Sequence, residues 1–223
     1  MPKSIFVTAT DTGVGKTTVS AALAKILKDR GYSVGYYKPV ETGCGQVCSD
    51  GELLSKITGQ PLDEITVYRF TQPVAPFVAQ QLEGEEIDIN RLYAHLDSLQ
   101  SKYEYIIVEG AGGLKVPITE QYGQIYTYAD FIYETGLPVL IVARAGLGTI
   151  NHTALTVDVL NFINAEIRGI ILNGYTGEDI SEDTNPEVIA QMTGVDILAL
   201  CSRSDTPVDE CYYRLLGVLE LIF

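Results

Sequence analysis

Short apolar runs alternate along the chain with longer segments whose apolar residues recur every three or four positions. The first apolar run covers residues 5–9, and helical spacing begins after Lys16. A short, fully apolar run is typical of a strand buried in a sheet, and the second pattern is typical of an amphipathic helix. The chain therefore begins with a strand, a short loop and a helix, which ends near Gly31.

The same alternation continues along the rest of the chain. Further strands are predicted at residues 33–37, 68–70, 105–108, 137–143, 167–172 and 195–200, and helices at residues 49–56, 77–82, 87–102, 128–132, 149–164 and 208–223. Strands that alternate with helices favour an α/β fold with a doubly wound, mostly parallel sheet and helices on both faces. No repeat or linker divides the chain, so residues 1–223 are predicted to form a single domain.

Composition agrees with one large core. The chain has 223 residues, of which 46% are hydrophobic and 20% charged, enough for one substantial domain. The formal net charge of −14 argues against nucleic acid and acidic membrane surfaces as partners. No apolar run approaches the roughly 20 residues of a membrane span, and the first strand follows the N-terminus too closely for a signal peptide. We therefore expect a cytoplasmic protein without membrane contact.

The four cysteines are few and scattered. Cys201 and Cys211 lie far from Cys44 and Cys48, and no histidine near them completes a metal site. We expect reduced thiols in ordinary positions. A disulfide or a metal site at Cys44 and Cys48 is the less favoured alternative.

The loop between the first strand and helix carries the clearest chemical signal. Its second half, with the first turn of the helix, is formed by Gly13, Val14, Gly15, Lys16, Thr17 and Thr18. Backbone N–H groups of such a loop, the helix dipole and a lysine converge on phosphate oxygens, and the threonine after the lysine offers its hydroxyl to magnesium. The pattern predicts a nucleotide-binding P-loop and a P-loop NTPase-like fold, although Thr10 stands where a strict P-loop has glycine. A glycine turn that only joins strand to helix is the alternative.

Two later segments place charged groups on the same edge of the sheet. Lys38 follows the second strand, and ligands of open parallel sheets bind beyond the carboxyl ends of the strands. Asp50 lies at the start of a short helix for which Ser49 is a candidate N-cap. Taken alone, a solvated strand end explains Lys38, and the helix dipole explains Asp50.

A carboxylate ends the strand at residues 105–108. Glu109 is followed by Gly110, Ala111 and Gly112, which allow the backbone to approach a ligand closely. A carboxylate in this position holds magnesium opposite the nucleotide in P-loop enzymes. With the P-loop upstream, a magnesium role is favoured over a solvated strand end.

Two further segments, one at the start of a helix and one at the end of a strand, carry candidate binding groups. The helix start at Thr149, Ile150 and Asn151 offers unpaired N–H groups to a carboxylate or phosphate, or is simply capped by its own side chains. Asn173 and Gly174 end the strand at residues 167–172. The asparagine amide can recognise a base edge, and a plain Asn-Gly turn is an equal alternative.

Together these segments resemble the dethiobiotin synthetase family, which closes the ureido ring of dethiobiotin with ATP. The resemblance runs from the first strand to about Asn173. It rests on five ordered motifs: Thr8 to Thr17, Gly35 to Val40, Ser49-Asp50, Val108 to Gly113, and Leu137-Pro138-Val139 with Leu147 to His152. The family joins 7,8-diaminononanoate, CO2 and ATP through a carbamate that attacks the γ-phosphate.

The resemblance implies roles for single residues. Thr17, Asp50 and Glu109 would surround magnesium, and Lys16 and Lys38 would act on the phosphates and the carbamate. Thr42 would lie near the substrate amines, and residues 110–112 near the phosphates. The amides of Thr149 to Asn151 would bind the substrate carboxylate in a neighbouring subunit, which implies a homodimer. Asn173 would contact adenine.

The chain departs from the family pattern at a few positions. Gly13 stands where the family often has an acidic residue. Gly146 stands where it has a basic residue, for which Arg144 is a stand-in. Residues 198–202 lack the family's usual adenine-contacting stretch.

Three rival functions remain. A DNA-partitioning or membrane-marking P-loop ATPase would carry a signature lysine where Asp11 stands. An amidotransferase-type synthetase would need a glutaminase segment, and a silent nucleotide-binding regulator need not keep Lys38 or Asp50.

Overall fold

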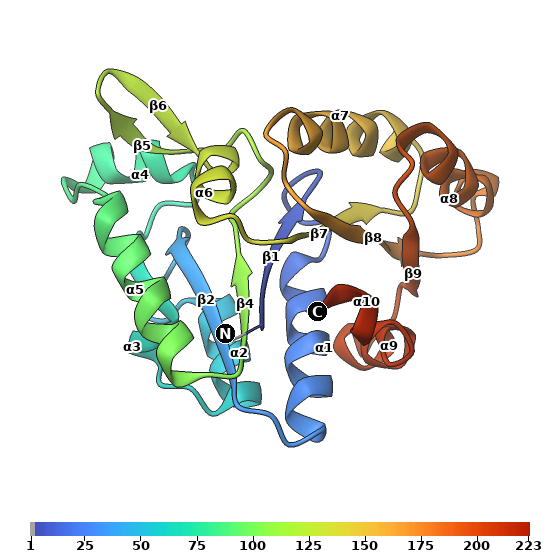
Figure 1. Ribbon diagram of the computed structural model, residues 1–223, viewed down its shortest axis with the longest axis horizontal. Coiled ribbons are helices and arrows are strands. Elements are labelled where there is room, and N and C mark those ends of the chain that lie inside the picture. Colours follow the sequence, from blue (N-terminus) through green and yellow to red (C-terminus); the bar gives the residue numbers. More distant parts are fainter. Residues whose placement is uncertain (1–2) are drawn as a thin grey trace.

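A computed structural model describes residues 3–223 and contains a central seven-stranded sheet (Figure 1). Its strands are β1 (Lys3–Ala9), β2 (Val34–Glu41), β3 (Thr66–Arg69), β4 (Tyr105–Glu109), β7 (Val139–Arg144), β8 (Ile167–Tyr175) and β9 (Ile197–Ser202). The order is β3-β2-β4-β1-β7-β8-β9, and each neighbouring pair is parallel. The predicted parallel α/β architecture is confirmed.

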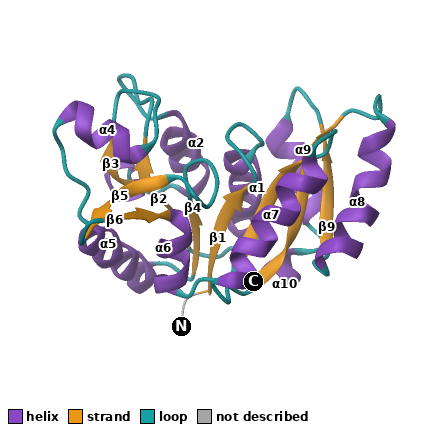
Figure 2. Cartoon of the chain, turned by 90° about the horizontal axis from the view of Figure 1, so that it is seen from above, coloured by secondary structure: helices purple, strands orange, loops and turns teal. Residues whose placement is uncertain are grey.

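Helices cover both faces of this sheet (Figure 2). They are α1 (Lys16–Asp29), α2 (Ser49–Thr58), α3 (Leu62–Ile65), α4 (Pro76–Glu83), α5 (Ile89–Lys102), α6 (Tyr128–Thr135), α7 (Thr149–Phe162), α8 (Ile180–Thr193), α9 (Pro207–Leu215) and α10 (Leu219–Ile222). Buried residues of α1, α2, α3, α9 and α10 form one core, and those of α4 to α8 form the other.

Alternation of side chains along the strands separates the two cores. In β1, Ile5 and Val7 belong to the core on the α1 side, whereas Phe6 between them belongs to the opposite core. All three side chains are fully buried. Strands buried on both faces read as continuous apolar runs, which explains why the sequence pattern located them.

Several parts of the fold, among them the short helix α3, differ from the sequence-based expectation. A hairpin of β5 (Pro117–Gln121) and β6 (Gln124–Thr127) lies apart from the main sheet, and it was not predicted. Helix α8 was also missed; it contains Pro186, and a proline inside a helical pattern argues against a continuous helix. The predicted single helix at residues 208–223 is two helices, because the chain turns at Gly217 between α9 and α10.

The cysteines require a correction. Cys44 and Cys48 form a disulfide, so the expectation of reduced thiols in ordinary loop positions is wrong for this pair. Both sulfurs are used in that bond, which leaves neither free for a metal in this form. Cys201 and Cys211 are free, as predicted, and both are buried.

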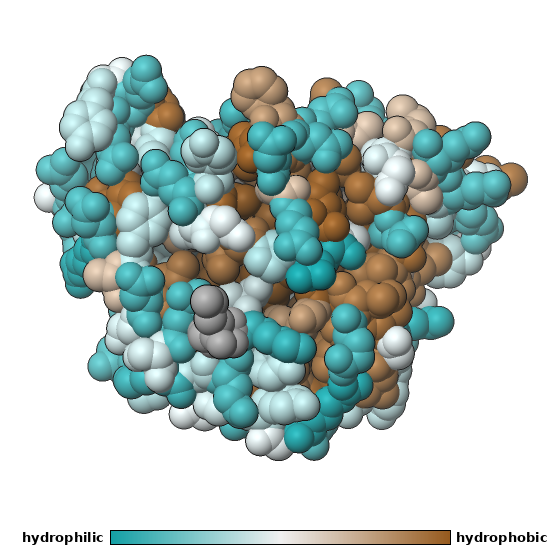
Figure 3. Space-filling view, viewed as in Figure 1, coloured by the Kyte–Doolittle hydropathy of each residue, from teal (hydrophilic) through white to brown (hydrophobic). Residues whose placement is uncertain are grey.

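One face of the molecule carries both polar and apolar side chains (Figure 3). Figure 3 shows hydrophobic side chains gathered mainly over the part of this face formed by the later elements of the chain. Within residues 3–223, no helix is both long and apolar enough to cross a membrane.

Candidate active site

The loop from Thr10 to Gly15 connects β1 to α1 in a conformation that depends on glycine. Gly15 has φ 102°, and a Cβ at this position would lie 2.1 Å from Nδ2 of Asn173. Asn173, at the end of β8, also donates a 2.8 Å hydrogen bond to the Val14 carbonyl. No side chain caps the N-terminus of α1. Its first N–H groups are therefore available to an anion, as in a phosphate-binding loop.

Lys16 begins α1 beneath this loop. It is only 7% exposed. Burial lowers the pKa of Lys16, and the neighbouring Lys38 lowers it further, while Glu109 opposes both effects. A buried ammonium group with a lowered pKa gains strongly from a bound polyanion, because the anion replaces the lost hydration.

Glu109, the last residue of β4, is the centre of a hydrogen-bond network. Its carboxylate is fully buried. The Thr17 hydroxyl donates to Oε1 over 2.8 Å, and the Ser20 hydroxyl donates to Oε2 over 2.7 Å. Both hydroxyls come from α1, three residues apart on one face of the helix. The network thus joins the phosphate loop to the end of β4.

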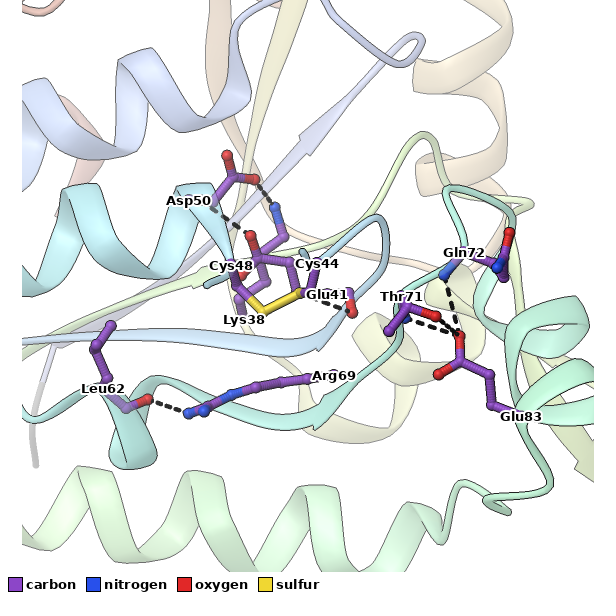
Figure 4. Close-up of a disulfide and its surroundings, with 10 residues drawn as sticks. All are labelled: Lys38, Glu41, Cys44, Cys48, Asp50, Leu62, Arg69, Thr71, Gln72 and Glu83. Atoms are coloured by element: carbon purple, nitrogen blue, oxygen red, sulfur yellow. Dashed lines mark hydrogen bonds and ion pairs between the residues drawn. A yellow bond between two sulfur atoms is a disulfide. The ribbon is translucent and has the colours of Figure 1, made fainter. Parts of the chain in front are cut away.

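Lys38 occupies the space between the carboxylates. Its Nζ lies 3.3 Å from Oε1 of Glu109 and forms an ion pair with Asp50 (Figure 4). Burial acts to lower the pKa of Lys38, but Glu109, Asp50 and Glu41 together raise it above the ordinary lysine value. The ammonium group therefore stays protonated and neutralises part of an acidic cluster.

Glu41 is a member of this cluster that sequence reasoning missed. Its carboxylate accepts a 3.0 Å hydrogen bond from the Asp50 N–H, which holds the start of α2. Burial raises the pKa of Glu41, against the opposing effect of Lys38. A glutamate just before the predicted Thr42 was the available signal, but nothing in the sequence showed that β2 extends through Glu41 and buries it.

These groups line one cavity of about 390 Å³. Among the residues predicted from sequence, it is lined by Gly13, Gly15, Lys16, Thr17, Thr18, Lys38, Thr42, Asp50, Glu109, Ala111 and Gly112. Thr12, Glu41 and Ser49 also line it, although no site role was predicted for them. The structure therefore gathers four separate segments of the chain, residues 12–18, 38–42, 49–50 and 109–112, at one edge of the sheet.

The donor atoms in this cavity suit a hard divalent cation. Thr17, Asp50 and Glu109 offer one hydroxyl and two carboxylates, and magnesium is bound by oxygen ligands of this kind. Lys38 already pairs with both carboxylates, so this position favours positive charge. The residues present fit a magnesium ion.

A second cavity of about 400 Å³ adjoins the first at Gly13. Its lining includes the predicted Val14, Asn173 and Gly174, together with Arg144 and Gly146. Its far side is formed by residues that were not predicted: Thr176, Glu182, Ser202, Arg203, Ser204 and Pro207. A ligand that fills both cavities would extend from the phosphate loop to the ends of β8 and β9.

The Glu182 carboxylate shapes this second cavity. It accepts hydrogen bonds from the N–H groups of Thr176 and Gly177, each 2.8 Å long. These bonds hold the turn that follows Gly174. Because Glu182 belongs to α8, the helix that the sequence pattern missed, this contact was not predicted.

Four predicted site residues do not line either cavity. Gly110 lies behind the first one, where a Cβ would approach the rings of Phe6 and Tyr128. Thr149, Ile150 and Asn151 form the first turn of α7, and Thr149 is buried. One chain therefore does not bring the start of α7 to the phosphate cavity.

Solved structures share this fold at low sequence identity. The MinC:MinD cell division complex of Aquifex aeolicus matches with a TM-score of 0.58 and 18% identity, covering 98% of this chain and 88% of that chain. A ParA family ATPase from Chlorobium tepidum matches with a TM-score of 0.58 and 15% identity, covering 99% and 94%. At this identity the likeness shows the fold alone.

Sequence relatives are much more similar. A family model described as an AAA domain matches residues 3–206. The ATP-dependent dethiobiotin synthetase of Aquifex aeolicus is 52% identical over 191 residues, which cover 86% of this chain and 85% of the relative. That of Bacillus subtilis is 42% identical over 206 residues, covering 90% and 87%. With this identity over most of both lengths, and with the motif residues assembled in one cavity, the chain belongs to the ATP-dependent dethiobiotin synthetase family.

Proposed function

We propose that this protein is an ATP-dependent cyclo-ligase that converts 7,8-diaminononanoate and CO2 to dethiobiotin, with release of ADP and phosphate, in biotin synthesis. One observation supports this reaction above the others. Lys38 lies between Asp50 and Glu109 in the same cavity as the phosphate loop and Lys16. A triphosphate and a carbamate are both anions. The volume and the two lysines of this cavity allow both to bind next to each other.

The reaction consists of three steps. One amine of the substrate adds to CO2 and loses a proton, which gives a carbamate. A carbamate oxygen attacks the γ-phosphorus and ADP leaves, so the carbamate becomes a mixed anhydride with phosphate. The second amine then attacks the carbamate carbon, the ring closes, and phosphate and a proton are released.

Each charged group has a role in these steps. The loop N–H groups and Lys16 bind the β- and γ-phosphates, where negative charge spreads as the phosphoryl group transfers. Lys38 stays protonated and stabilises the carbamate and the transferring group. Thr42, at the rim of the same cavity, contacts the diamine. A preorganised contact of this kind is worth about 3 kcal/mol in a transition state.

We include magnesium in the proposal. Thr17, Asp50 and Glu109 would hold the ion, which supplies positive charge to the β- and γ-phosphate oxygens. The Thr17 hydroxyl donates to Glu109, and Lys38 pairs with both carboxylates. These contacts hold the three oxygen donors close together.

The second cavity is proposed to bind the nucleoside. Asn173 and Gly174 lie at its base, next to the phosphate loop. The Asn173 Nδ2 donates to the Val14 carbonyl, and its Oδ1 accepts from the Cys211 thiol over 3.8 Å. The second N–H and the second lone pair of this amide are the groups that would contact adenine. Glu182 supports this role by holding the turn after Gly174.

A homodimer in the cytoplasm completes the proposal. The start of α7 lies outside the phosphate cavity of its own chain, so Thr149, Ile150 and Asn151 would bind the substrate carboxylate in the cavity of a second copy. Exposed apolar residues on and next to α7 support such an interface: Leu147 is 82% exposed, Leu155 56% and Phe162 86%. ATP as a substrate supports a cytoplasmic location.

A nucleotide-dependent switch is the alternative, since the MinD and ParA structures share the fold. Three features speak against it. Asp11 stands where such ATPases carry their signature lysine, and the net charge of −14 disfavours DNA and acidic lipid. A switch also has no need of Lys38 between two carboxylates.

The decisive experiment measures ADP release with and without the diamine, in the presence of bicarbonate and magnesium. We expect ADP only when diaminononanoate is present, with one dethiobiotin formed for each ADP. ADP release at the same rate without the diamine would contradict the synthetase and support a switch. The Lys38→Ala variant serves as control, because it should lose product formation while it remains folded.

A further inference from the structure

The Cys44–Cys48 disulfide lies in the loop that joins two parts of the candidate active site. Figure 4 shows it beside Glu41, with Lys38 and Asp50 close by. Each cysteine is only 7% exposed. None of the roles proposed above uses these sulfurs.

Both ends of this loop carry residues of the phosphate cavity. Thr42 precedes the disulfide, and Ser49 and Asp50 follow it directly; all three line the cavity. Between β2 and α2 the chain has no regular structure, and it contains Gly43 and Gly45. Gly43 has φ +75°, a conformation that glycine readily leaves and enters. The N–H groups of Gly43 and Cys44 donate to the carbonyls of Gln72 and Phe70, which anchors the first part of the loop. Without the cross-link, residues 45–48, directly before Ser49 and Asp50, are the part of the loop with more conformations available.

Two contacts hold the start of α2. Cys48 is its N-cap residue, and its side chain makes no capping hydrogen bond. The Glu41 carboxylate caps the helix instead, by accepting from the Asp50 N–H at 3.0 Å. The disulfide is the second contact, since it ties the N-cap to Cys44. Removing it leaves the Glu41 carboxylate to hold the backbone of Asp50 and the Lys38 ammonium group to hold its carboxylate.

A cavity adjoins the two cysteines. A cavity of about 230 Å³, separate from the phosphate cavity, is lined by both cysteines and by Val47, Arg69 and Thr71. Arg69 adds positive charge at this opening, which attracts an attacking thiolate. Disulfides in proteins of reducing compartments are usually redox-active rather than permanent. The proposed cytoplasmic location therefore favours a bond that is opened and closed.

We propose that the Cys44–Cys48 pair is a redox-sensitive site, opened by dithiols, that controls the position of Asp50 and Thr42. A dithiol thiolate attacks one sulfur and breaks the S–S bond, which gives a mixed disulfide. The second thiol of the reductant then displaces the protein sulfur. Two electrons and two protons pass to Cys44 and Cys48, and the reductant leaves as a cyclic disulfide. Glutathione disulfide reverses the reaction and yields two molecules of glutathione.

The test compares the full-length protein after treatment with dithiothreitol or with glutathione disulfide. Alkylation in guanidinium chloride followed by intact mass should add two groups to the oxidised chain and four to the reduced chain, which has four cysteines. Hydrogen exchange of residues 42–50 should be roughly tenfold faster after reduction, equal to about 1.4 kcal/mol of lost protection. We expect kcat/KM for the diamine to fall by a similar factor.

Matched variants separate this pair from the other cysteines. The Cys44→Ser/Cys48→Ser variant should behave like the reduced protein under both treatments, and the Cys201→Ser/Cys211→Ser variant should keep the redox response. Four alkylations after glutathione disulfide, or equal exchange of residues 42–50 in both states, would overturn the proposal. So would faster exchange with unchanged kcat/KM.

The kinetic part of this test depends on the proposed synthetase function, whereas the thiol count and the hydrogen exchange do not. Absence of dethiobiotin in both redox states would therefore count against the function. The redox site would still be judged by its alkylation and exchange.

Discussion

The Ser20 hydroxyl donates a 2.7 Å hydrogen bond to Oε2 of Glu109, and both side chains are fully buried. The other carboxylate oxygen, Oε1, faces the cavity, where it accepts from Thr17 and lies near Lys38. Ser20 therefore helps to fix the rotation of this carboxylate from Oε2, while Thr17 and Lys38 contact Oε1. It is a positioning residue for Glu109.

The Ser20→Ala variant should weaken magnesium-dependent turnover. Loss of a hydrogen bond to a charged group costs about 1.5–3 kcal/mol, and we expect roughly a tenfold rise in the magnesium concentration for half-maximal activity. Steady-state kinetics over a magnesium titration measures this. The Thr135→Ala variant is the control, because it also removes a hydrogen-bonded hydroxyl from a helix, here a half-buried one, and does not line the cavity. An equal magnesium response in Ser20→Ala and the parent would exclude a positioning role.

The Lys38→Met variant should lose stability as well as activity. Removing one partner of a buried ion pair leaves uncompensated charge on Glu109 and Asp50, and costs about 3 kcal/mol. The pKa of Lys38 is higher in the folded protein than the ordinary lysine value of the unfolded chain. The stability that its charge gives the folded protein is therefore fully present below the ordinary lysine pKa and is lost only at higher pH. The stability difference from the parent should therefore stay constant from pH 6 to 9.

Urea unfolding of both proteins at several pH values measures this difference. Magnesium should recover part of the lost stability, because it supplies positive charge to the same carboxylates. The Lys25→Met variant, at a surface ion pair with Asp209, should change stability much less. If Lys38→Met proved as stable as Lys25→Met, the electrostatic account of the cluster would be wrong.

Nucleotide affinity should decline at alkaline pH because of Lys16. Its pKa lies below the ordinary lysine value in the free protein, mainly through burial, and only the protonated form binds phosphate strongly. ATP affinity should fall as pH rises through this lowered pKa, by up to about tenfold per pH unit beyond it. Binding should also take up protons in that range.

Calorimetry with ATP, without diamine and in buffers of different ionisation enthalpy, measures both quantities. Lys38 should not contribute, because its pKa is raised. The Lys16→Met variant is the matched control, and it should bind weakly with no proton uptake. A parent protein whose affinity is constant up to the ordinary lysine pKa would contradict the predicted direction.

The proposed dimer makes a surface prediction. Leu155 on α7 is 56% exposed, and a glutamate there would place charge in an apolar interface. We expect Leu155→Glu to raise the dimer dissociation constant at least about tenfold and to make specific activity depend on protein concentration. Analytical ultracentrifugation measures the first effect. Ile180→Glu on α8, where the parent residue is 80% exposed, is the control and should leave the association state unchanged.

Local sequence determined most of the architecture. Strands such as β1 and β7 are buried on both faces, so they read as continuous apolar runs, and the helices between them keep helical spacing. The phosphate loop was equally legible, because its chemistry depends on glycines and a lysine that are neighbours in the chain. Lys38 and Glu109 were predicted from their positions at strand ends, Asp50 gained its role from the family resemblance, and the structure brings the three together.

Tertiary structure alone decided the remaining features. Ser20 and Glu41 look like ordinary polar positions until burial and partners are known, since a hydrogen bond across 89 residues leaves no local pattern. The Cys44–Cys48 disulfide required a loop that brings the two Cα atoms to 4.5 Å, and spacing alone did not favour it. Helix α8 was hidden by Pro186, and its Glu182 thus remained unassigned. The sequence pattern indicates which residues each segment buries. Contacts between distant segments depend on the order of the strands in the sheet.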